Sequence, residues 1–285
     1  MTTVAIIGAG TMGHGIAYVA LTAGYDVVLD DVDTDALQRA QAHIGLALDS
    51  GVMRGKVTEE VRQDALTHLS LTSDLDAAVA GASIVIEAAP EVLALKQAIF
   101  KRVSERIASD TLLATNTSSL SITSIAAAGT CPERAVGMHF FNPVAAMKLV
   151  EIVRGNSTSP DTVARARAFA ESLGKTAIVV GDSPGFATSR LGVVLGLEAM
   201  RMVEQGVASA GDIDAAMELG YNHPVGPLKL TDIVGLDVRL AVADHLYDSI
   251  GDATYKAPGI LRAMVADGKL GRKSGQGFYK WETIR

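Results

Sequence analysis

Apolar and polar positions alternate with two different periods along this chain. In the first part, short apolar runs rich in β-branched residues are separated by longer amphipathic stretches, a pattern typical of a parallel sheet with crossover helices. We expect strands over residues 3–7, 26–29, 83–87, 111–115, 135–138, 147–153 and 176–180. We expect a helix that follows the glycine-rich run 8–13 and continues through residue 23. Further helices are expected over residues 34–50 and 160–173, with two more from about residue 58 and around residue 96.

From residue 186 onward the strand pattern gives way to helical periodicity. Helical segments are expected over residues 186–206 and from near Ser209, Thr231 and Ala257. The run Gly-Asp-Ser-Pro-Gly at residues 181–185 separates the two patterns, because glycine and proline break regular elements. We therefore expect an α/β domain over residues 1–184 and an all-α domain over residues 185–285.

Composition and charge exclude several classes of protein. Of 285 residues, 48% are hydrophobic and 20% are charged, as in an ordered globular protein. A net charge of −7 argues against nucleic acid as a partner. The single cysteine, Cys131, cannot form an intrachain disulfide, which is consistent with a reducing cytosol. Without a basic leader or a run long enough for a bilayer, we expect a cytoplasmic protein that has no membrane partner.

A glycine-rich loop follows the first strand directly and opens a helix. Its sequence, Gly8-Ala9-Gly10-Thr11-Met12-Gly13, has the spacing G-x-G-x-x-G. The first glycine allows the tight turn, the second lets the backbone approach a pyrophosphate, and the third allows close helix packing. The amides around Thr11 and Met12, at the helix start, would meet the negative charge. This context predicts a dinucleotide bound to a Rossmann-like, doubly wound sheet.

Two aspartates end the next strand, a little over twenty residues beyond Gly8. A carboxylate at that position accepts hydrogen bonds from the adenosine ribose and repels a 2′-phosphate, so we expect NAD as the cofactor. Spacing alone does not choose between Asp30 and Asp31. The other one is expected to be a solvated turn residue.

His139 and Glu151 are candidates for a catalytic pair. His139 follows an apolar run and precedes an Asn-Pro turn, and Glu151 lies near the middle of the next strand. If the two strands pair, the imidazole and the carboxylate come within hydrogen-bond reach, which is the geometry of a base and its orienter. Ser118 adds a hydroxyl for the same substrate oxygen. The alternative is a satisfied structural histidine.

Other polar residues are expected near the same sheet edge, because loops at the carboxyl ends of parallel strands line the ligand crevice. Glu91 and Lys96 follow one strand, and Asn116 follows the next. A surface i, i+5 pair is the alternative for Glu91 and Lys96. Arg54 and Lys56 form a small basic turn, for which a solvated surface is the alternative.

Taken together, the motifs resemble the 3-hydroxyacyl-CoA dehydrogenase family, including its short-chain 3-hydroxybutyryl-CoA members. The resemblance spans nearly the whole chain and rests on motifs in family-like order: GAGTMGHGIA, IEAAPE, TNTSSLSI, GMHFFNPVAAMKLVE, DSPGF, GPLKLTDIVGLD and GRKSGQGFY. It implies an NAD-dependent (S)-3-hydroxyacyl-CoA dehydrogenase that acts reversibly on the 3-hydroxyl of an acyl-CoA substrate. It also implies a homodimer formed through the helical domain.

The resemblance implies roles for individual residues. His139 would be the catalytic base, Glu151 its partner, and Ser118 a hydroxyl that contacts substrate, while Asp31 is favoured over Asp30 for the ribose. Residues expected beside the cofactor are Glu91, Lys96 and Asn116, and those expected beside the substrate, including its coenzyme A phosphates, are Arg54, Lys56 and Asn142.

One position departs from the family pattern. The family usually has an asparagine before the arginine that follows the Pro-Gly-Phe motif, and Ser189 stands there in this chain. Serine is shorter and has no amide to donate, although its hydroxyl can donate or accept. Ser189 is thus a candidate active-site residue at which turnover or substrate range would differ from the family.

Two rival functions remain on the same scaffold. One is a dehydrogenase of a free hydroxy acid or sugar acid, similar to the gulonate-type enzymes. The other is a non-catalytic NAD-binding protein, similar to the lens crystallins that resemble this family. The presence of Ser118, His139 and Glu151 together argues against the second.

Overall fold

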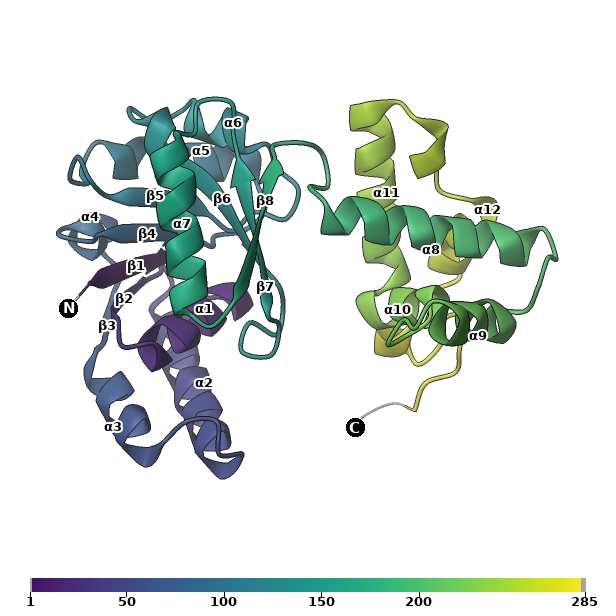
Figure 1. The fold of residues 1–285 in the computed structure, drawn as a ribbon, viewed down its shortest axis with the longest axis horizontal. Helices are drawn as coiled ribbons and strands as arrows, with labels where there is room; N and C mark the ends of the chain where they lie inside the picture. The colour runs from purple at the N-terminus through teal and green to yellow at the C-terminus, as the bar shows by residue number, and fades with distance from the viewer. Residues whose placement is uncertain (1, 283–285) are drawn as a thin grey trace. The chain divides into compact units, whose positions relative to one another are not determined.

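The computed structural model describes residues 2–282 and divides into two compact units, Met1–Phe186 and Ala187–Arg285. Each unit has its own apolar core (Figure 1). No helix within residues 2–282 is both long enough and apolar enough to cross a bilayer.

The first unit is built on an eight-stranded sheet with the order β3-β2-β1-β4-β5-β6-β7-β8. All neighbouring strands are parallel except β6 and β7, which are antiparallel. The predicted fold class, a doubly wound sheet followed by an all-α domain, is confirmed. The strands are β1 (Thr3–Ile7), β2 (Asp26–Asp30), β3 (Leu69–Thr72), β4 (Ile84–Glu87), β5 (Leu112–Thr115), β6 (Ala135–Phe140), β7 (Leu149–Arg154) and β8 (Thr176–Gly181).

Helices cover both faces of this sheet, as Figure 1 shows for α7 in front and α5 behind. Alternate strand residues supply the two cores: Val4 and Ile6 belong to one, Ala5 and Ile7 to the other. This is why the strands read as continuous apolar runs. The helices are α1 (Thr11–Thr22), α2 (Thr34–Met53), α3 (Glu59–Thr67), α4 (Leu75–Val79), α5 (Leu93–Ser104), α6 (Ile122–Ala126) and α7 (Pro160–Ser172).

The regular elements of the second unit are all helices in the part that the structure describes, apart from isolated β-bridges among Gly271, Gln276 and Lys280. One helix was expected from near Thr231, but α10 begins at Pro227 and a separate helix, α11, begins at Leu236. Proline suits a first helical position, and Gly235, at φ 109°, allows the sharp break between the two helices. The helices are α8 (Thr188–Glu204), α9 (Ala210–Gly220), α10 (Pro227–Val234), α11 (Leu236–Ile250) and α12 (Gly259–Ala266), with short 3-10 turns at Ala253–Tyr255 and Arg272–Ser274.

Some short elements of the first unit were not predicted. These are β3, α4, α6 and a 3-10 turn at Pro132–Arg134, which are too short for a periodic pattern to emerge. The strand expected from Met147 begins at Leu149. The backbone N–H of Met147 instead donates to the Pro143 carbonyl, 3.0 Å away, so Met147 belongs to the turn.

Candidate active site

The glycine loop forms a cradle for a dinucleotide between β1 and α1. A Cβ at Gly8 would lie 2.7 Å from the Ala88 carbonyl oxygen, and one at Gly13 would lie 1.7 Å from the Gly8 carbonyl oxygen, so both positions require glycine. A Cβ at Gly10 would meet nothing within 4 Å. Gly10 is also the N-cap of α1 and supplies no side-chain cap. The open side of the loop therefore presents helix-start amides, which suits the pyrophosphate of NAD.

Asp31 is bound to this loop by hydrogen bonds. Its Oδ2 accepts from the Ala9 backbone N–H at 2.7 Å, and its Oδ1 accepts from the Asp33 N–H at 2.9 Å. Asp30 has a different environment, because it is the last residue of β2 and is 4% exposed. The expectation that the second aspartate is a solvated turn residue is therefore wrong. Burial, and then the charge of Asp31, raise the pKa of Asp30 to about 6.

A cavity of about 410 Å³ opens beside the glycine loop. Gly8, Asp30 and Asp31 line one side of it, and Leu95 and Ile99 of α5 line another. Its position at the carboxyl ends of β1 and β2, next to the pyrophosphate cradle, is where an open α/β sheet binds a nucleotide. The cavity is large enough for the adenosine part of a dinucleotide.

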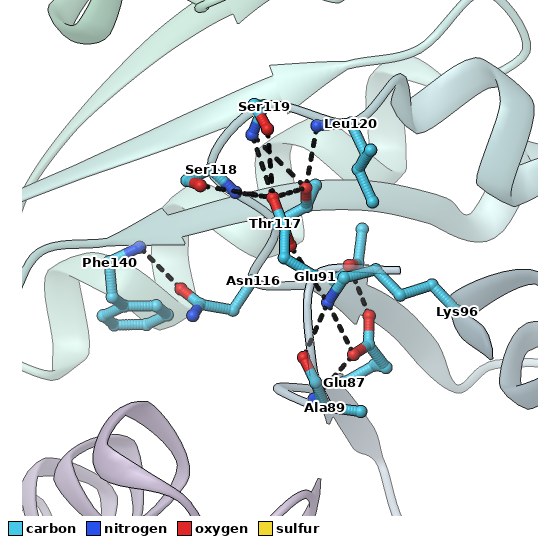
Figure 2. A network of polar contacts seen from close by, with 11 residues as sticks. Glu87, Ala89, Glu91, Lys96, Asn116, Thr117, Ser118, Ser119, Leu120 and Phe140 are labelled. Carbon is cyan, nitrogen blue, oxygen red and sulfur yellow. Dashed lines mark hydrogen bonds and ion pairs between the residues drawn. The ribbon is translucent and has the colours of Figure 1, made fainter. Parts of the chain in front are cut away.

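A buried ion pair supports the loop that follows β4 (Figure 2). Lys96 Nζ lies 2.8 Å from Glu87 Oε1 and donates to the Ala89 carbonyl at 3.1 Å. Glu87 Oε1 also accepts from the Ala89 N–H at 2.7 Å, and its Oε2 accepts from the Thr115 hydroxyl at 2.6 Å. Glu87 is fully buried and Lys96 is 1% exposed. The surface-pair alternative for Lys96 is therefore wrong.

Sequence reasoning did not single out Glu87 as a site residue. A signal was present, because Glu87 is the one charged residue of the run SIVIE, and a buried carboxylate requires a partner.

Glu91 joins the loop after β4 to the loop after β5. Its Oε1 accepts from the Thr117 hydroxyl at 2.6 Å and from the backbone N–H groups of Ser118 and Ser119 at 2.8 and 3.1 Å (Figure 2). Lys96 Nζ lies 3.5 Å from its Oε2. Burial raises the pKa of Glu91, but the hydrogen bond from Thr117 and the charge of Lys96 outweigh burial and hold that pKa below its usual range.

The loop after β5 carries two of the predicted site residues. The Ser118 hydroxyl, on the exposed side of the loop, donates to Glu91 Oε1 at 3.2 Å. The side chain of Asn116 points toward β6, where its Oδ1 accepts from the Phe140 N–H at 2.9 Å (Figure 2). Asn116 thereby connects this loop to the residue next to His139.

His139 and Glu151 lie directly opposite each other on β6 and β7. His139 Nδ1 is 2.7 Å from Glu151 Oε2, and the two side chains are 9% and 0% exposed. The strand pairing that brings them together is as predicted. The His139 ring packs on Phe141, with ring centroids 4.4 Å apart. A carboxylate that accepts from Nδ1–H places the lone pair on Nε2, so the pair is arranged to take a proton through that nitrogen.

The basic turn after α2 lies near the turn that follows β6. Arg54 and Lys56 line a small hollow of about 160 Å³ together with Ala145 and Ala146. Asn142, in the same turn as the two alanines, is exposed. Two cations thus lie beside the segment that leads away from His139, where a phosphate-bearing ligand would be attracted.

Ser189 is the second residue of α8 and belongs to the second unit. Its role in the active site stays a prediction.

Comparisons with known proteins point in one direction. Residues 3–183 match the profile of the 3-hydroxyacyl-CoA dehydrogenase NAD binding domain, and residues 185–281 match that of the 3-hydroxyacyl-CoA dehydrogenase C-terminal domain. The chain is 43% identical over 277 residues to a probable 3-hydroxybutyryl-CoA dehydrogenase of Bacillus subtilis, covering 97% of this chain and 96% of the relative.

Solved structures agree with this pattern. The crystal structure of (S)-3-hydroxybutyryl-CoA dehydrogenase from Ralstonia eutropha matches with a TM-score of 0.95 and 42% identity, covering 99% of each chain. A more distant match is an NAD⁺-dependent 5-dehydrogenase of 5-formyl-3-hydroxy-2-methylpyridine 4-carboxylic acid, with a TM-score of 0.78 and 33% identity, covering 99% of this chain and 92% of that chain.

Proposed function

This chain belongs to the 3-hydroxyacyl-CoA dehydrogenase family, and we propose that it oxidises the 3-hydroxyl of a short-chain (S)-3-hydroxyacyl-CoA reversibly, with NAD as the hydride acceptor. The observation that carries the proposal is the buried His139–Glu151 pair, with 2.7 Å between Nδ1 and Oε2. It lies in the same domain as a glycine cradle for a dinucleotide. The relatives named above favour a four-carbon substrate.

In the proposed reaction, His139 Nε2 accepts the proton of the substrate hydroxyl while the C3 hydride leaves for the cofactor. Glu151 stabilises the imidazolium that forms and holds the ring in one tautomer. In the reverse direction, His139 returns the proton to the oxygen of the 3-oxo group. Ser118 supplies a second hydrogen-bonding group for the same substrate oxygen. To do so, its hydroxyl exchanges its hydrogen bond to Glu91 for one to the substrate.

NAD, when bound, supplies the nicotinamide that accepts the hydride. The chain would hold the pyrophosphate with the loop from Gly8 to Gly13 and the ribose with Asp31. Glu91, Lys96 and Asn116 would support the cofactor side of the site through the loops that they connect. A carboxylate beside the ribose disfavours the 2′-phosphate of NADP.

Coenzyme A would be recognised by the basic turn at Arg54 and Lys56. Both side chains are exposed, as groups that bind a mobile, polyanionic ligand need to be. They share a hollow with Ala145 and Ala146, which belong to the segment after His139, and Asn142 is an exposed residue of the same segment. This arrangement supports a thioester whose acyl end reaches the histidine while its phosphates stay at the surface.

We further propose that Ser189 takes part in the reaction and that the helical unit carries the surface of a homodimer. A cytoplasmic location also stays a prediction.

A second candidate is a dehydrogenase of a free acid. This candidate is supported by the match to a dehydrogenase whose name specifies a pyridine carboxylic acid. The lens-crystallin alternative would retain the cofactor but show no turnover.

One experiment separates the three candidate functions. Oxidation of NADH is followed by absorbance with acetoacetyl-CoA, and in parallel with acetoacetate at the same concentration. The proposal expects rapid turnover of the thioester and little of the free acid. Equal rates on both would favour the free-acid enzyme. NADH binding without turnover of either substrate would favour a non-catalytic protein.

A further inference from the structure

Asp30 is a buried carboxyl group in an otherwise largely apolar part of the adenosine cavity. Its neighbours in that cavity include Ile7, Leu75 and Ile99. Strand register places Asp30 between Ile7 of β1 and Thr72 of β3. The sheet therefore holds the backbone of Asp30, and its side chain lines the cavity.

No group within residues 2–282 donates a hydrogen bond to the Asp30 carboxylate, which is 4% exposed. Arg102 lines the same cavity, but its Nε donates to Asp76 at 2.9 Å. Asp74 also lies nearby, and its Oδ1 caps α4 by accepting from the Asp76 N–H at 3.0 Å. The carboxylate oxygens are not among the fully enclosed unpaired polar atoms of residues 2–282, so they meet solvent inside the cavity. A ligand that fills the cavity would displace that solvent and would need to donate a hydrogen bond to the carboxylate in its place.

The position of Asp31 identifies which part of the ligand supplies that donor. Asp31 is the residue expected to bind the adenosine ribose, and Asp30 precedes it on the wall of the same cavity. The group joined to that ribose is the base, whose flat apolar faces suit Leu95 and Ile99. Adenine carries an amine, its single hydrogen-bond donor on the edge far from the ribose, and a carboxylate can only accept.

We propose that Asp30 recognises the adenine base of the dinucleotide. Its carboxylate would accept a hydrogen bond from the exocyclic amine of adenine. The inference rests on the proposed use of NAD and adds a specificity-determining residue to that site. In hypoxanthine a carbonyl oxygen takes the place of the amine and would be repelled by the carboxylate, and the donor that remains on that edge, N1–H, is displaced from the position of the amine. The cavity therefore selects adenine over hypoxanthine.

The test compares two probes on the full-length protein: NADH and its reduced hypoxanthine analogue. Fluorescence titration at about pH 8, where aspartate is ionised, gives a Kd for each. We expect wild-type protein to bind NADH about tenfold or more tightly than the analogue. In Asp30→Asn the amide can either donate or accept, so the two Kd values should come within about twofold. Asp31→Asn is the control, because it should weaken both dinucleotides alike.

A second measurement changes the pH instead of Asp30 itself. At about pH 5 a protonated Asp30 can donate to the carbonyl oxygen of the analogue, so the preference for adenine in wild-type protein should shrink. The charged groups that face Asp30 are Asp31, Asp74 and Arg102, and Asp31→Asn tests whether the first of them carries the pH effect instead.

The two proposals fail in different ways. Equal Kd values for both dinucleotides in wild-type protein, or an unchanged ratio in Asp30→Asn, would overturn the role of Asp30 and leave NAD dependence standing. No binding of NADH by wild-type protein would overturn the proposed function itself.

Discussion

His139 and Glu151 face each other across the antiparallel pair of strands β6 and β7, with Nδ1 and Oε2 2.7 Å apart. The bond assigns one ring nitrogen to the carboxylate and leaves the other for the substrate.

His139→Gln should lose turnover and keep the cofactor. Glutamine can form hydrogen bonds but cannot accept a proton near neutral pH, so we expect kcat to fall about 10²–10⁴-fold. The Kd for NADH should change by less than about threefold, because the glycine cradle is untouched. Steady-state rates with acetoacetyl-CoA and a fluorescence titration measure the two effects. Near-native turnover would remove His139 as the base.

Glu151→Gln should also slow turnover, through the imidazole. A neutral amide stabilises the imidazolium poorly and no longer selects one tautomer. We expect kcat to fall about 10–100-fold and the pH at half-maximal rate of 3-hydroxybutyryl-CoA oxidation to move. The measurement is a pH–rate profile of the variant beside wild type. If the rate fell with no change in the profile, Glu151 would have a packing role only.

Lys96→Met should destabilise the first unit, because it leaves the fully buried Glu87 without its cation. Breaking a buried pair in this way costs about 3–5 kcal/mol. The double variant Glu87→Gln with Lys96→Met should recover part of the loss. Urea unfolding of the single and double variants measures the coupling. Arg39→Ala, which breaks an exposed pair with Asp33, is the control and should change little.

Lys56→Glu should weaken binding of the thioester and leave binding of NADH unchanged. Reversing this exposed charge should raise KM for acetoacetyl-CoA about tenfold at low salt, and less at high salt because of screening. The Kd for NADH should not change. Lys101→Glu, an exposed lysine of α5, is the matched control for net charge. A similar rise in KM for both variants would indicate a general field effect and not a coenzyme A site.

Ionised Asp30 should destabilise the protein without cofactor. Burial, and then the charge of Asp31, raise the pKa of Asp30 from 3.8 to about 6. The folded state binds more protons than the unfolded state between these values, so stability from this group is full below about pH 4 and is lost as the pH rises through about 6. Asp30→Asn should therefore raise the melting temperature at about pH 8 by about 4 °C. Melting temperatures of both proteins are measured from about pH 5 to about pH 8. Equal melting temperatures of variant and wild type over this range would contradict the prediction.

Much of the fold could be predicted because its signals are local. The glycine loop between a strand and a helix, the continuous apolar strands and the break before α8 each follow from a few neighbouring residues. The elements that were missed, β3, α4 and α6, are four or five residues long. Strands β4 and β5 are equally short but are continuous apolar runs, whereas the residues of β3 are only partly buried or exposed, so β3 lacks that signal.

The site was predictable where chemistry and register coincide, as for His139 and Glu151. It was not predictable where a side chain turns inward. Lys96 looks like an ordinary helix-surface lysine in sequence, and its burial depends on Glu87 and Ala89, which precede it in a different element. In the same way, spacing left Asp30 and Asp31 equivalent. Only the structure separates Asp30, a buried carboxyl at the end of β2, from Asp31, which accepts a hydrogen bond from the glycine loop.

The antiparallel step between β6 and β7 constrains how this enzyme can diverge. Residues 141–148 join the two strands, and the ladder between the strands places Glu151 opposite His139. Because side chains alternate across a strand, a shift of this pairing by one residue would put Val150 or Ile152 opposite His139 and turn the carboxylate to the other face. Insertions and deletions that shift this register should therefore be absent from active descendants.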